Sequence, residues 1–319
     1  MPILDMPLEQ LKVYQGTNPC PEDMDEYWDR GLEEIKQIDP KITIEKSNFQ
    51  IDFAECYHLY FTGVGGARIH AKYIKPKNAK EPHPAVLFFH GYSGNCGGWY
   101  DKLPYAAMGY TVVAMDCRGQ GGLSEDVGGV KGTTFRGQIV RGLSDSKEKL
   151  LFRQIFLDTA QLANIVMGFK EVDPDRVAAI GGSQGGGLTL ACGALEPRIK
   201  KLAPRYPFLS DYKRVWDLDL DQNAYEELRT YFRFFDPLHE RKEEIFTTLG
   251  YIDIQHLAKR IRGEVLMGIT LMDTICPPST QFAVYNKIQS KKEAVIYPDY
   301  GHEHLPGFDD MVLEFLKEW

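Results

Sequence analysis

The sequence predicts an α/β protein in which a mostly parallel central sheet is flanked by helices. Two observations indicate this class: short, wholly apolar segments recur along the chain, and helical segments separate them. Apolar runs of four or five residues, such as these, are typical of strands buried on both faces. Because strand and helix alternate, helices are expected on both faces of the sheet. The apolar segments are 85–89, 111–115, 177–180, 265–269 and 294–297.

Before the first apolar segment, the chain is expected to form a helix and a hairpin. Trp28 and Ile35 recur at helical spacing, so residues 1 to about 45 are interpreted as an amino-terminal helical extension lying against the main body. The segments 56–61 and 68–74 alternate in polarity around a glycine-rich link, which is the pattern of a β-hairpin.

The rest of the chain contains two predicted helices and two long excursions. Residues 150–167 carry apolar side chains on one helical face, and residues 309–319 are expected to form the last helix. The stretch from about 207 to 250 is dense in aromatic and charged residues and is interpreted as a helical insertion. Its pattern is compatible with a cap over a functional site and with helices that only pack or mediate oligomerisation. The glycine-rich stretch 121–147 is a second excursion on the same side. A single domain is expected over residues 1–319.

The charge balance argues against two classes of partner. Lys and Arg number 37 against 45 Asp and Glu, which gives a formal net charge of −8. Nucleic acid and anionic membranes both require clustered basic charge, and no basic run stands out. The amino terminus lacks the basic and apolar regions of a secretory signal, and no apolar run is long enough to cross a bilayer. We therefore expect no nucleic-acid or membrane partner and a cytoplasmic location.

The cysteines and glycines give no indication of a metal or cofactor. No C-x-x-C pair and no neighbouring His at ligand spacing occurs, so reduced, buried thiols are expected rather than a metal site. No Walker or dinucleotide fingerprint is present, and Gly119-x-Gly121 is too short to count as one. No cofactor is therefore predicted. The six cysteines are Cys20, Cys56, Cys96, Cys117, Cys192 and Cys276.

A G-x-S-x-G motif lies at the end of one predicted strand. Residues 181–185 read Gly-Gly-Ser-Gln-Gly, and a helical run, 188–195, follows them. A turn this tight between strand and helix strains the backbone of Ser183, and a side chain at Gly181 or Gly185 would clash. The turn would expose Ser183 Oγ at the carboxyl end of the sheet, beside the positive end of the helix. The motif in this context predicts the nucleophile of an α/β hydrolase.

The chain order of α/β hydrolases predicts the two partners of this serine. A serine hydroxyl needs a base, and in this fold the acid and then the histidine follow Ser183 along the chain. His302 directly follows a glycine in the last loop and is preferred to His304 as the base. Asp273 directly follows a buried strand, where it can hold and stabilise the imidazole. Asp299 is the rival acid, but it lies only three residues before His302.

Acyl transfer also needs N–H donors for the oxygen that becomes negative. One donor should be the main-chain N–H of Gln184, the residue after the nucleophile. The other should come from the loop that reads His-Gly-Tyr-Ser-Gly over 90–94, with the N–H of Tyr92 as donor. His90 is expected to brace this loop rather than to act as a base.

With these residues, the chain resembles the acetyl xylan esterase/cephalosporin C deacetylase family, carbohydrate esterase family 7. The resemblance covers nearly the whole chain. Several motifs carry it together, although each alone is weak. The matching motifs are Arg118-Gly-Gln120, residues 181–185, Asp273–Pro278 and His302-Glu303, together with Pro19–Asp23 and Tyr212–Trp216.

The resemblance implies hydrolysis of acetyl esters on small substrates, such as acetylated xylo-oligosaccharides and cephalosporin C, by an acetyl-serine mechanism. It implies Ser183, Asp273 and His302 as the catalytic triad and the N–H groups of Tyr92 and Gln184 as the oxyanion hole. It also implies a metal-free, cytoplasmic, ring-like homohexamer with inward-facing active sites.

Some interpretations stay open at this point. Arg118 and Gln120 are interpreted as structural, because a guanidinium beside such loops more often ties them together than touches an acetyl group. The alternatives to this function are a general short-chain carboxylesterase, a serine peptidase of the same fold, and a non-catalytic binding protein. A peptidase of the prolyl-oligopeptidase kind would normally need a large added domain, for which this chain has no room.

Overall fold

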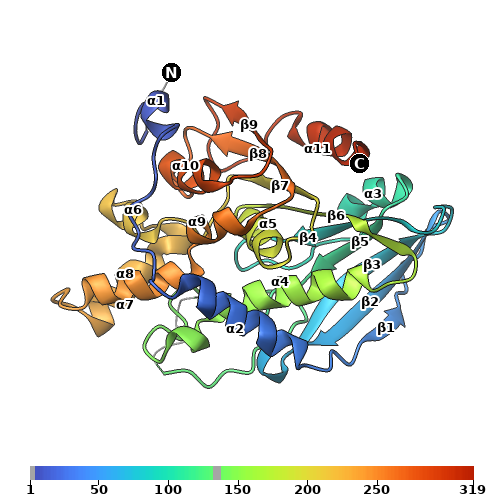
Figure 1. Cartoon of the computed structure of the whole chain (residues 1–319), viewed down its shortest axis with the longest axis horizontal. Coiled ribbons are helices and arrows are strands. Elements are labelled where there is room, and N and C mark those ends of the chain that lie inside the picture. Colours follow the sequence, from blue (N-terminus) through green and yellow to red (C-terminus); the bar gives the residue numbers. More distant parts are fainter. Residues whose placement is uncertain (1–3, 132–137) are drawn as a thin grey trace.

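The computed structural model describes residues 4–131 and 138–319, so part of the excursion predicted over 121–147 lies outside the described residues. The described residues form one sheet of nine strands in the order β1-β2-β3-β5-β4-β6-β7-β8-β9 (Figure 1). From β5 to β9 all neighbouring strands are parallel, whereas β1, β2 and β3 are joined antiparallel at one end. The strands are β1 Thr43–Lys46, β2 Ala54–Thr62, β3 Arg68–Pro76, β4 His83–Phe89, β5 Thr111–Met115, β6 Val172–Gly182, β7 Lys201–Arg205, β8 Glu264–Thr270 and β9 Lys292–Tyr297.

This architecture confirms the predicted fold class. Each of the five apolar segments lies inside a parallel strand, and the predicted hairpin is the pair β2–β3. Two strands were not predicted. The first, β7, reads Lys-Leu-Ala-Pro-Arg, so its charges and Pro204 hide it, although it is almost wholly buried between β6 and β8. The second, β1, is a short, exposed edge strand at 43–46, so the amino-terminal extension ends in a strand rather than in helix.

Helices cover both faces of the sheet (Figure 1). The helices α2, α4 and α5 belong to a large apolar cluster on one face, and α3 and α11 pack over the other. Trp28 of α2 is completely buried, stacks on Phe156 of α4, and donates to the carbonyl of Tyr251 at 3.0 Å. The predicted amino-terminal helix therefore does lie against the main body. The helices are α1 Leu8–Leu11, α2 Met24–Lys36, α3 Leu103–Ala107, α4 Leu151–Met167, α5 Gln184–Leu195, α6 Tyr212–Asp217, α7 Glu226–Phe235, α8 Lys242–Leu249, α9 Ile254–Leu257, α10 Pro278–Lys287 and α11 Phe308–Lys317.

The predicted insertion is longer than expected. Helices α6 to α9 all lie between β7 and β8, so the helical region continues about ten residues past 250. The added part is held by Asp253, whose side chain accepts the N–H of Gln255 at the start of α9. Apolar residues around this cap, such as Ile252 and Leu257, are buried. The insertion was predicted from its many aromatic residues, and these become sparse before this segment. The predicted end of the insertion is therefore too early.

Arg118 joins two parts of the scaffold next to the site. Its guanidinium is completely buried and forms two 2.7 Å bonds with the carboxylate of Asp158 on α4. It also donates to the carbonyl of Val64 at 2.9 Å. A bidentate pair of this kind fixes orientation as well as charge. These contacts agree with the structural role that was expected for Arg118.

The cysteines are all free thiols, as expected, but one of them is not buried. Cys20 is exposed near the amino terminus, and the other five lie inside the fold. No helix within residues 4–131 and 138–319 combines the length and apolar content needed to cross a membrane.

Candidate active site

Ser183 occupies a sharp turn between β6 and α5. Its backbone has φ 57° and ψ −122°, a left-handed conformation that is strained for a residue with a side chain. The turn needs its glycines, because a Cβ at Gly185 would lie 2.0 Å from the carbonyl oxygen of Phe89. A Cβ at Gly181 would lie 2.5 Å from the backbone of Gly185. The strain and the glycine requirement are those predicted from the motif.

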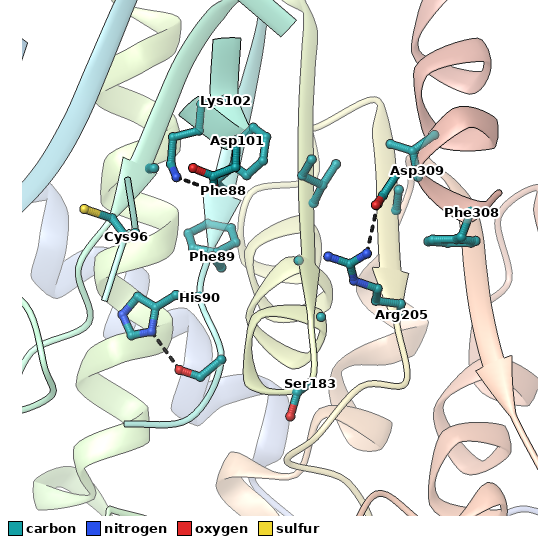
Figure 2. Close-up of a pocket in the computed structure, with 18 of the residues that line it drawn as sticks. Phe88, Phe89, His90, Cys96, Asp101, Lys102, Ser183, Arg205, Phe308 and Asp309 are labelled. Carbon is teal, nitrogen blue, oxygen red and sulfur yellow. Dashed lines mark hydrogen bonds and ion pairs between the residues drawn. The ribbon is translucent and has the colours of Figure 1, made fainter. Parts of the chain in front are cut away.

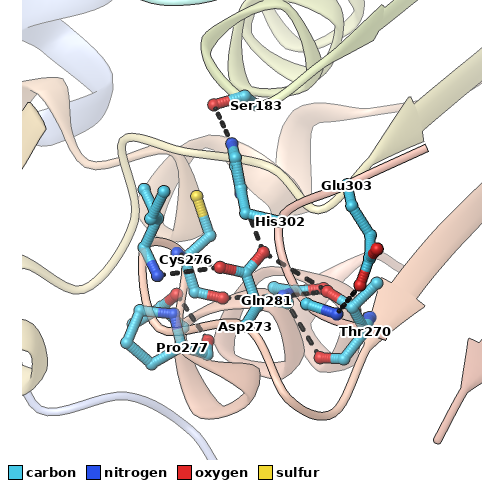
Figure 3. Close-up of polar contacts among 11 residues, drawn as sticks. Ser183, Thr270, Asp273, Cys276, Pro277, Gln281, His302 and Glu303 are labelled. Atoms are coloured by element: carbon cyan, nitrogen blue, oxygen red, sulfur yellow. Dashed lines mark hydrogen bonds and ion pairs between the residues drawn. The ribbon is translucent and has the colours of Figure 1, made fainter. Parts of the chain in front are cut away.

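The structure brings the three predicted catalytic side chains into one hydrogen-bonded row (Figure 3). His302 Nε2 lies 3.0 Å from Ser183 Oγ, and His302 Nδ1 lies 2.8 Å from Asp273 Oδ2. Because a carboxylate can only accept, Nδ1 carries the proton and Nε2 is left to accept from the serine hydroxyl. The imidazole of His302 is therefore in the tautomer that can remove a proton from Ser183.

Asp273 is completely buried and held from its other side. Its Oδ1 accepts the main-chain N–H groups of Ile275 and Cys276, both at 2.8 Å. The hydroxyl of Thr270 donates to Oδ2 at 3.3 Å. The rival acid, Asp299, makes no hydrogen bond with His302 in the described part of the chain. The geometry thus favours Asp273 over Asp299.

A buried glutamine on α10, which was not among the predicted site residues, supports this acid. Gln281 Oε1 accepts the N–H of Thr270 at 3.1 Å, and its Nε2 donates to the carbonyl of Cys276 at 2.7 Å. It therefore fixes the two ends of the turn that carries Asp273. A polar residue in the first turns of a helix gives no sequence signal for such a role.

The side chain of Gln184 connects the serine turn with two neighbouring loops by hydrogen bonds. Its side-chain amide forms a reciprocal pair with the amide of Gln120, at 2.9 and 3.0 Å. Its Nε2 also lies 3.3 Å from the carbonyl of His90 and 3.4 Å from that of Gly91. Among the described residues, the main-chain N–H of Gln184 and that of Tyr92 donate to no protein acceptor. Both predicted oxyanion donors are therefore unpaired in the described part of the chain, as an oxyanion hole requires.

His90 braces its loop, as expected. Its Nε2 accepts the main-chain N–H of Cys117 at 3.0 Å, so its Nδ1 carries the proton that is donated to the carbonyl of Gly91 at 2.8 Å. Burial lowers the pKa of His90, which favours this neutral form. With both ring nitrogens engaged, His90 ties the ends of β4 and β5 together.

A buried acid of the insertion contacts the loop that carries Tyr92. Glu227 on α7 accepts a hydrogen bond from the Tyr92 hydroxyl, and its Oε2 accepts the N–H of Val140 at 2.9 Å. Burial raises the pKa of Glu227 from its ordinary 4.5 to about 7. The ring of Tyr92 packs against Phe208. The insertion therefore contacts the predicted oxyanion loop directly, which the sequence could not show.

Within the part of the chain that the structure describes, two groups of side chains lie close enough to hold a metal ion. His70, Cys96 and Asp116 form one of them, although they are far apart in the sequence. There, His70 Nδ1 and Asp116 Oδ2 already bond to each other at 2.6 Å. The other group consists of Asp273, Cys276 and His302, whose acid and imidazole are bonded in the serine row. In both groups, a hydrogen bond already joins the imidazole and the carboxylate that would have to bind a metal.

We expect Gln120→Ala to lower kcat about tenfold, with little change in KM, on acetyl esters, the substrates that the family resemblance implies. Without Gln120, the side-chain amide of Gln184 loses its partner, and the first turn of α5 can shift the Gln184 N–H that is predicted to face the oxyanion. Steady-state kinetics on p-nitrophenyl acetate would measure the effect. The exposed Gln37→Ala is the matched control and should behave like the wild type. Unchanged kcat in Gln120→Ala would contradict this positioning role.

We expect Glu227→Gln to become more stable relative to the wild type as pH rises from 5 to 7. The folded protein holds a proton on Glu227 in this window, whereas the unfolded chain, with an ordinary pKa of 4.5, releases it. The contribution of Glu227 to the free energy of unfolding therefore falls as pH rises, by about 3 kcal/mol in total. Glutamine imitates the protonated acid and removes this loss. Urea unfolding at several pH values measures the difference, and the exposed Glu243→Gln should show none.

A serine on a strand-to-helix turn, with imidazole and carboxylate following on later loops of a mostly parallel sheet, places the chain among the α/β hydrolases. Within that class, the chain belongs to the acetyl xylan esterase family. The model of that family, described as acetyl xylan esterase (AXE1), matches residues 1–319. The family resemblance inferred from the motifs is thereby confirmed, and with it the prediction of a carboxylic ester hydrolase.

Two solved structures resemble the whole chain. Acetyl xylan esterase 1 from Thermoanaerobacterium sp. JW/SL YS485 is 65% identical, with 99% of each chain covered and a TM-score of 0.98. The acetyl xylan esterase from Paenibacillus sp. R4 is 35% identical, with 98% of this chain and 100% of that chain covered and a TM-score of 0.94. The curated acetyl esterase Axe7A of Xylanibacter ruminicola is 27% identical over 304 residues, or 92% of this chain. This chain spans 65% of the length of that relative.

Proposed function

We propose that the protein is a serine esterase that removes O-acetyl groups from small substrates, such as acetylated xylo-oligosaccharides and cephalosporin C. The observation that carries the proposal is the hydrogen-bonded row of Ser183, His302 and Asp273 on the serine turn of an acetyl xylan esterase family member. The 65% identity to a solved acetyl xylan esterase over nearly the full length supports the substrate class.

The geometry accounts for each step of the proposed mechanism. Ser183 Oγ attacks the acetyl carbonyl while His302 Nε2 takes its proton. The resulting oxyanion accepts the N–H groups of Tyr92 and Gln184, and the imidazolium is stabilised by the buried carboxylate of Asp273. As the C–O bond to the alcohol breaks, His302 returns the proton to the leaving oxygen, and an acetyl-serine remains. The same base then activates water, which releases acetate and regenerates the serine.

Acetate release from acetylated xylo-oligosaccharides and from cephalosporin C tests this proposal. Release from both substrates, together with faster hydrolysis of p-nitrophenyl acetate than of the butyrate and longer esters, is the expected result. Equal rates across acyl lengths would instead indicate a general carboxylesterase. Activity on p-nitrophenyl acetate alone would retain the serine chemistry and reject the proposed substrates.

We further propose a homohexamer and a cytoplasmic location, which the family resemblance implies. Phe234 at the end of α7 and Leu238 just after it are 68% and 78% exposed, and apolar side chains gathered on a surface often mark subunit contacts. The six free thiols suit a reducing compartment. Light scattering should give a mass six times that of one chain, and a single-chain mass would reject the hexamer.

A further inference from the structure

A cavity of about 560 Å³ lies between α3 and α11 and reaches Ser183 and His302 (Figure 2). Its lining includes the apolar side chains of Phe88, Ile180 and Phe308. A volume of this size is typical of sites for small-molecule ligands. An acetyl group has only three heavy atoms and would leave most of it empty. The cavity therefore suits the rest of the ester, not the acyl part.

The position of the cavity relative to the catalytic side chains also indicates that it binds the alcohol part of the ester. Ser183 and His302 line it, whereas Tyr92 and Gln184, which carry the predicted oxyanion N–H groups, do not. In acyl transfer, the carbonyl oxygen turns toward the oxyanion donors and the leaving oxygen must lie near the imidazole that protonates it. A cavity that opens beside His302 thus lies on the path of the leaving alcohol.

Arg205 brings a charged group into this cavity. It is the last residue of β7, and its Nη1 lies 2.9 Å from Asp309 Oδ1 of α11. The side chains are 30% and 54% exposed, so a ligand can reach both. The residue before the nucleophile makes room for this arrangement, because a Cβ on Gly182 would lie 2.7 Å from Arg205 Nε. The second glycine of the serine motif is therefore tied to the position of Arg205.

Tyr206 adds a polar group beside the base. Its ring centroid lies 4.7 Å from that of His302, and it lines the same cavity. It is held in a left-handed backbone conformation, φ 31°, with its N–H donating to the carbonyl of Gly268 at 2.8 Å. Among residues 4–131 and 138–319, no group forms a hydrogen bond with its hydroxyl. An aromatic ring that ends in an unpaired hydroxyl is thus placed next to the leaving-group position.

The chemistry of this lining matches a polyol ring. Guanidinium donors and a carboxylate acceptor held side by side can bind neighbouring hydroxyl groups, and charged hydrogen bonds are the stronger kind. The apolar side chains of the lining and the ring of Tyr206 offer surface for the C–H face of a sugar. Figure 2 shows Lys102 and Asp101, bonded at 2.8 Å, on the other side of the cavity from Arg205 and Asp309.

We propose that the cavity between α3 and α11 is the subsite for the alcohol part of the ester, a carbohydrate, and that Arg205 and Tyr206 recognise its hydroxyl groups. The proposal rests on the proposed esterase function and adds which end of the substrate is recognised and by which side chains. Arg205 and Tyr206 act here as specificity residues: they favour sugar acetates over acetyl esters of small alcohols.

The test compares Arg205→Met and Tyr206→Phe on two substrates, acetylated xylotriose and methyl acetate. Methionine keeps the stem of Arg205 and removes its donors, and phenylalanine keeps the ring against His302 and removes only the hydroxyl. The ratio of kcat/KM for acetylated xylotriose to that for methyl acetate should fall at least tenfold in Arg205→Met and about threefold in Tyr206→Phe. The matched control is Arg241→Met, which breaks an exposed arginine–carboxylate pair at the start of α8 and should leave the ratio unchanged.

A second measurement does not depend on activity toward sugars. Xylotriose should inhibit methyl acetate hydrolysis competitively, with an inhibition constant at least tenfold higher for Arg205→Met than for the wild type. If both variants keep the wild-type ratio and inhibition constant, the subsite assignment is overturned while the esterase function stands. If the wild type hydrolyses methyl acetate but neither hydrolyses acetylated xylotriose nor binds xylotriose, the carbohydrate substrate class and the subsite both fail. Thermal unfolding of each variant shows whether a loss comes from misfolding.

Discussion

Ser183→Ala is expected to lower kcat/KM on acetyl esters by about four orders of magnitude or more. The variant removes the only atom that can form the acyl bond, and the free imidazole of His302 can then at best assist water. Some rate above the uncatalysed reaction should remain, because the variant keeps the proposed oxyanion donors, the N–H groups of Tyr92 and Gln184. Stability should change by less than about 1 kcal/mol, since the variant loses the hydrogen bond between Ser183 Oγ and His302 but adds no atom to the turn.

The measurement is hydrolysis of p-nitrophenyl acetate and acetylated xylo-oligosaccharides by matched preparations. Ser290→Ala is the control, because its hydroxyl bonds to the carbonyl of Gly263 in the loop before β8, away from the catalytic row. It should retain activity within about twofold. If Ser183→Ala kept a tenth or more of the wild-type rate on either substrate, Ser183 would not be the nucleophile for that reaction.

The parts of the fold that could be predicted are those whose signal is local. A strand buried on both faces must be apolar along its whole length, so β4, β5 and β8 are visible as runs. The serine turn is visible because its close backbone contacts allow only glycine at 181 and 185. The strand β7 has no such run, since Lys201 at its start bonds to the carbonyl of Phe315 and its polar end lies in the site.

The parts of the site that could not be predicted depend on pairings between distant residues. The amides of Gln120 and Gln184 are 64 positions apart, and Tyr92 and Glu227 are 135 apart. Each residue alone looks like an ordinary polar position, and its role exists only once the fold brings its partner within hydrogen-bonding distance. Arg205 is a further example, because its place beside Ser183 depends on the missing side chain of Gly182.

Asp273→Asn is expected to lower kcat by about three to four orders of magnitude, whereas Asp299→Asn should change it less than about threefold. The hydrogen bonds around Asp273 determine how an asparagine would sit. Two main-chain N–H groups donate to Oδ1, so the amide oxygen would stay there and the NH₂ group would replace Oδ2. That NH₂ faces His302 Nδ1 and can only donate.

The imidazole would then have to accept at Nδ1 and carry its proton on Nε2, the nitrogen 3.0 Å from Ser183 Oγ. In this tautomer the base cannot remove the serine proton, so the loss should fall on kcat with KM nearly unchanged, and the folded structure should be kept. Steady-state kinetics of the two aspartate variants distinguishes the acids directly. A large loss in Asp299→Asn together with a near-normal Asp273→Asn would assign the acid to Asp299, and the buried carboxylate beside His302 would then have only a structural role.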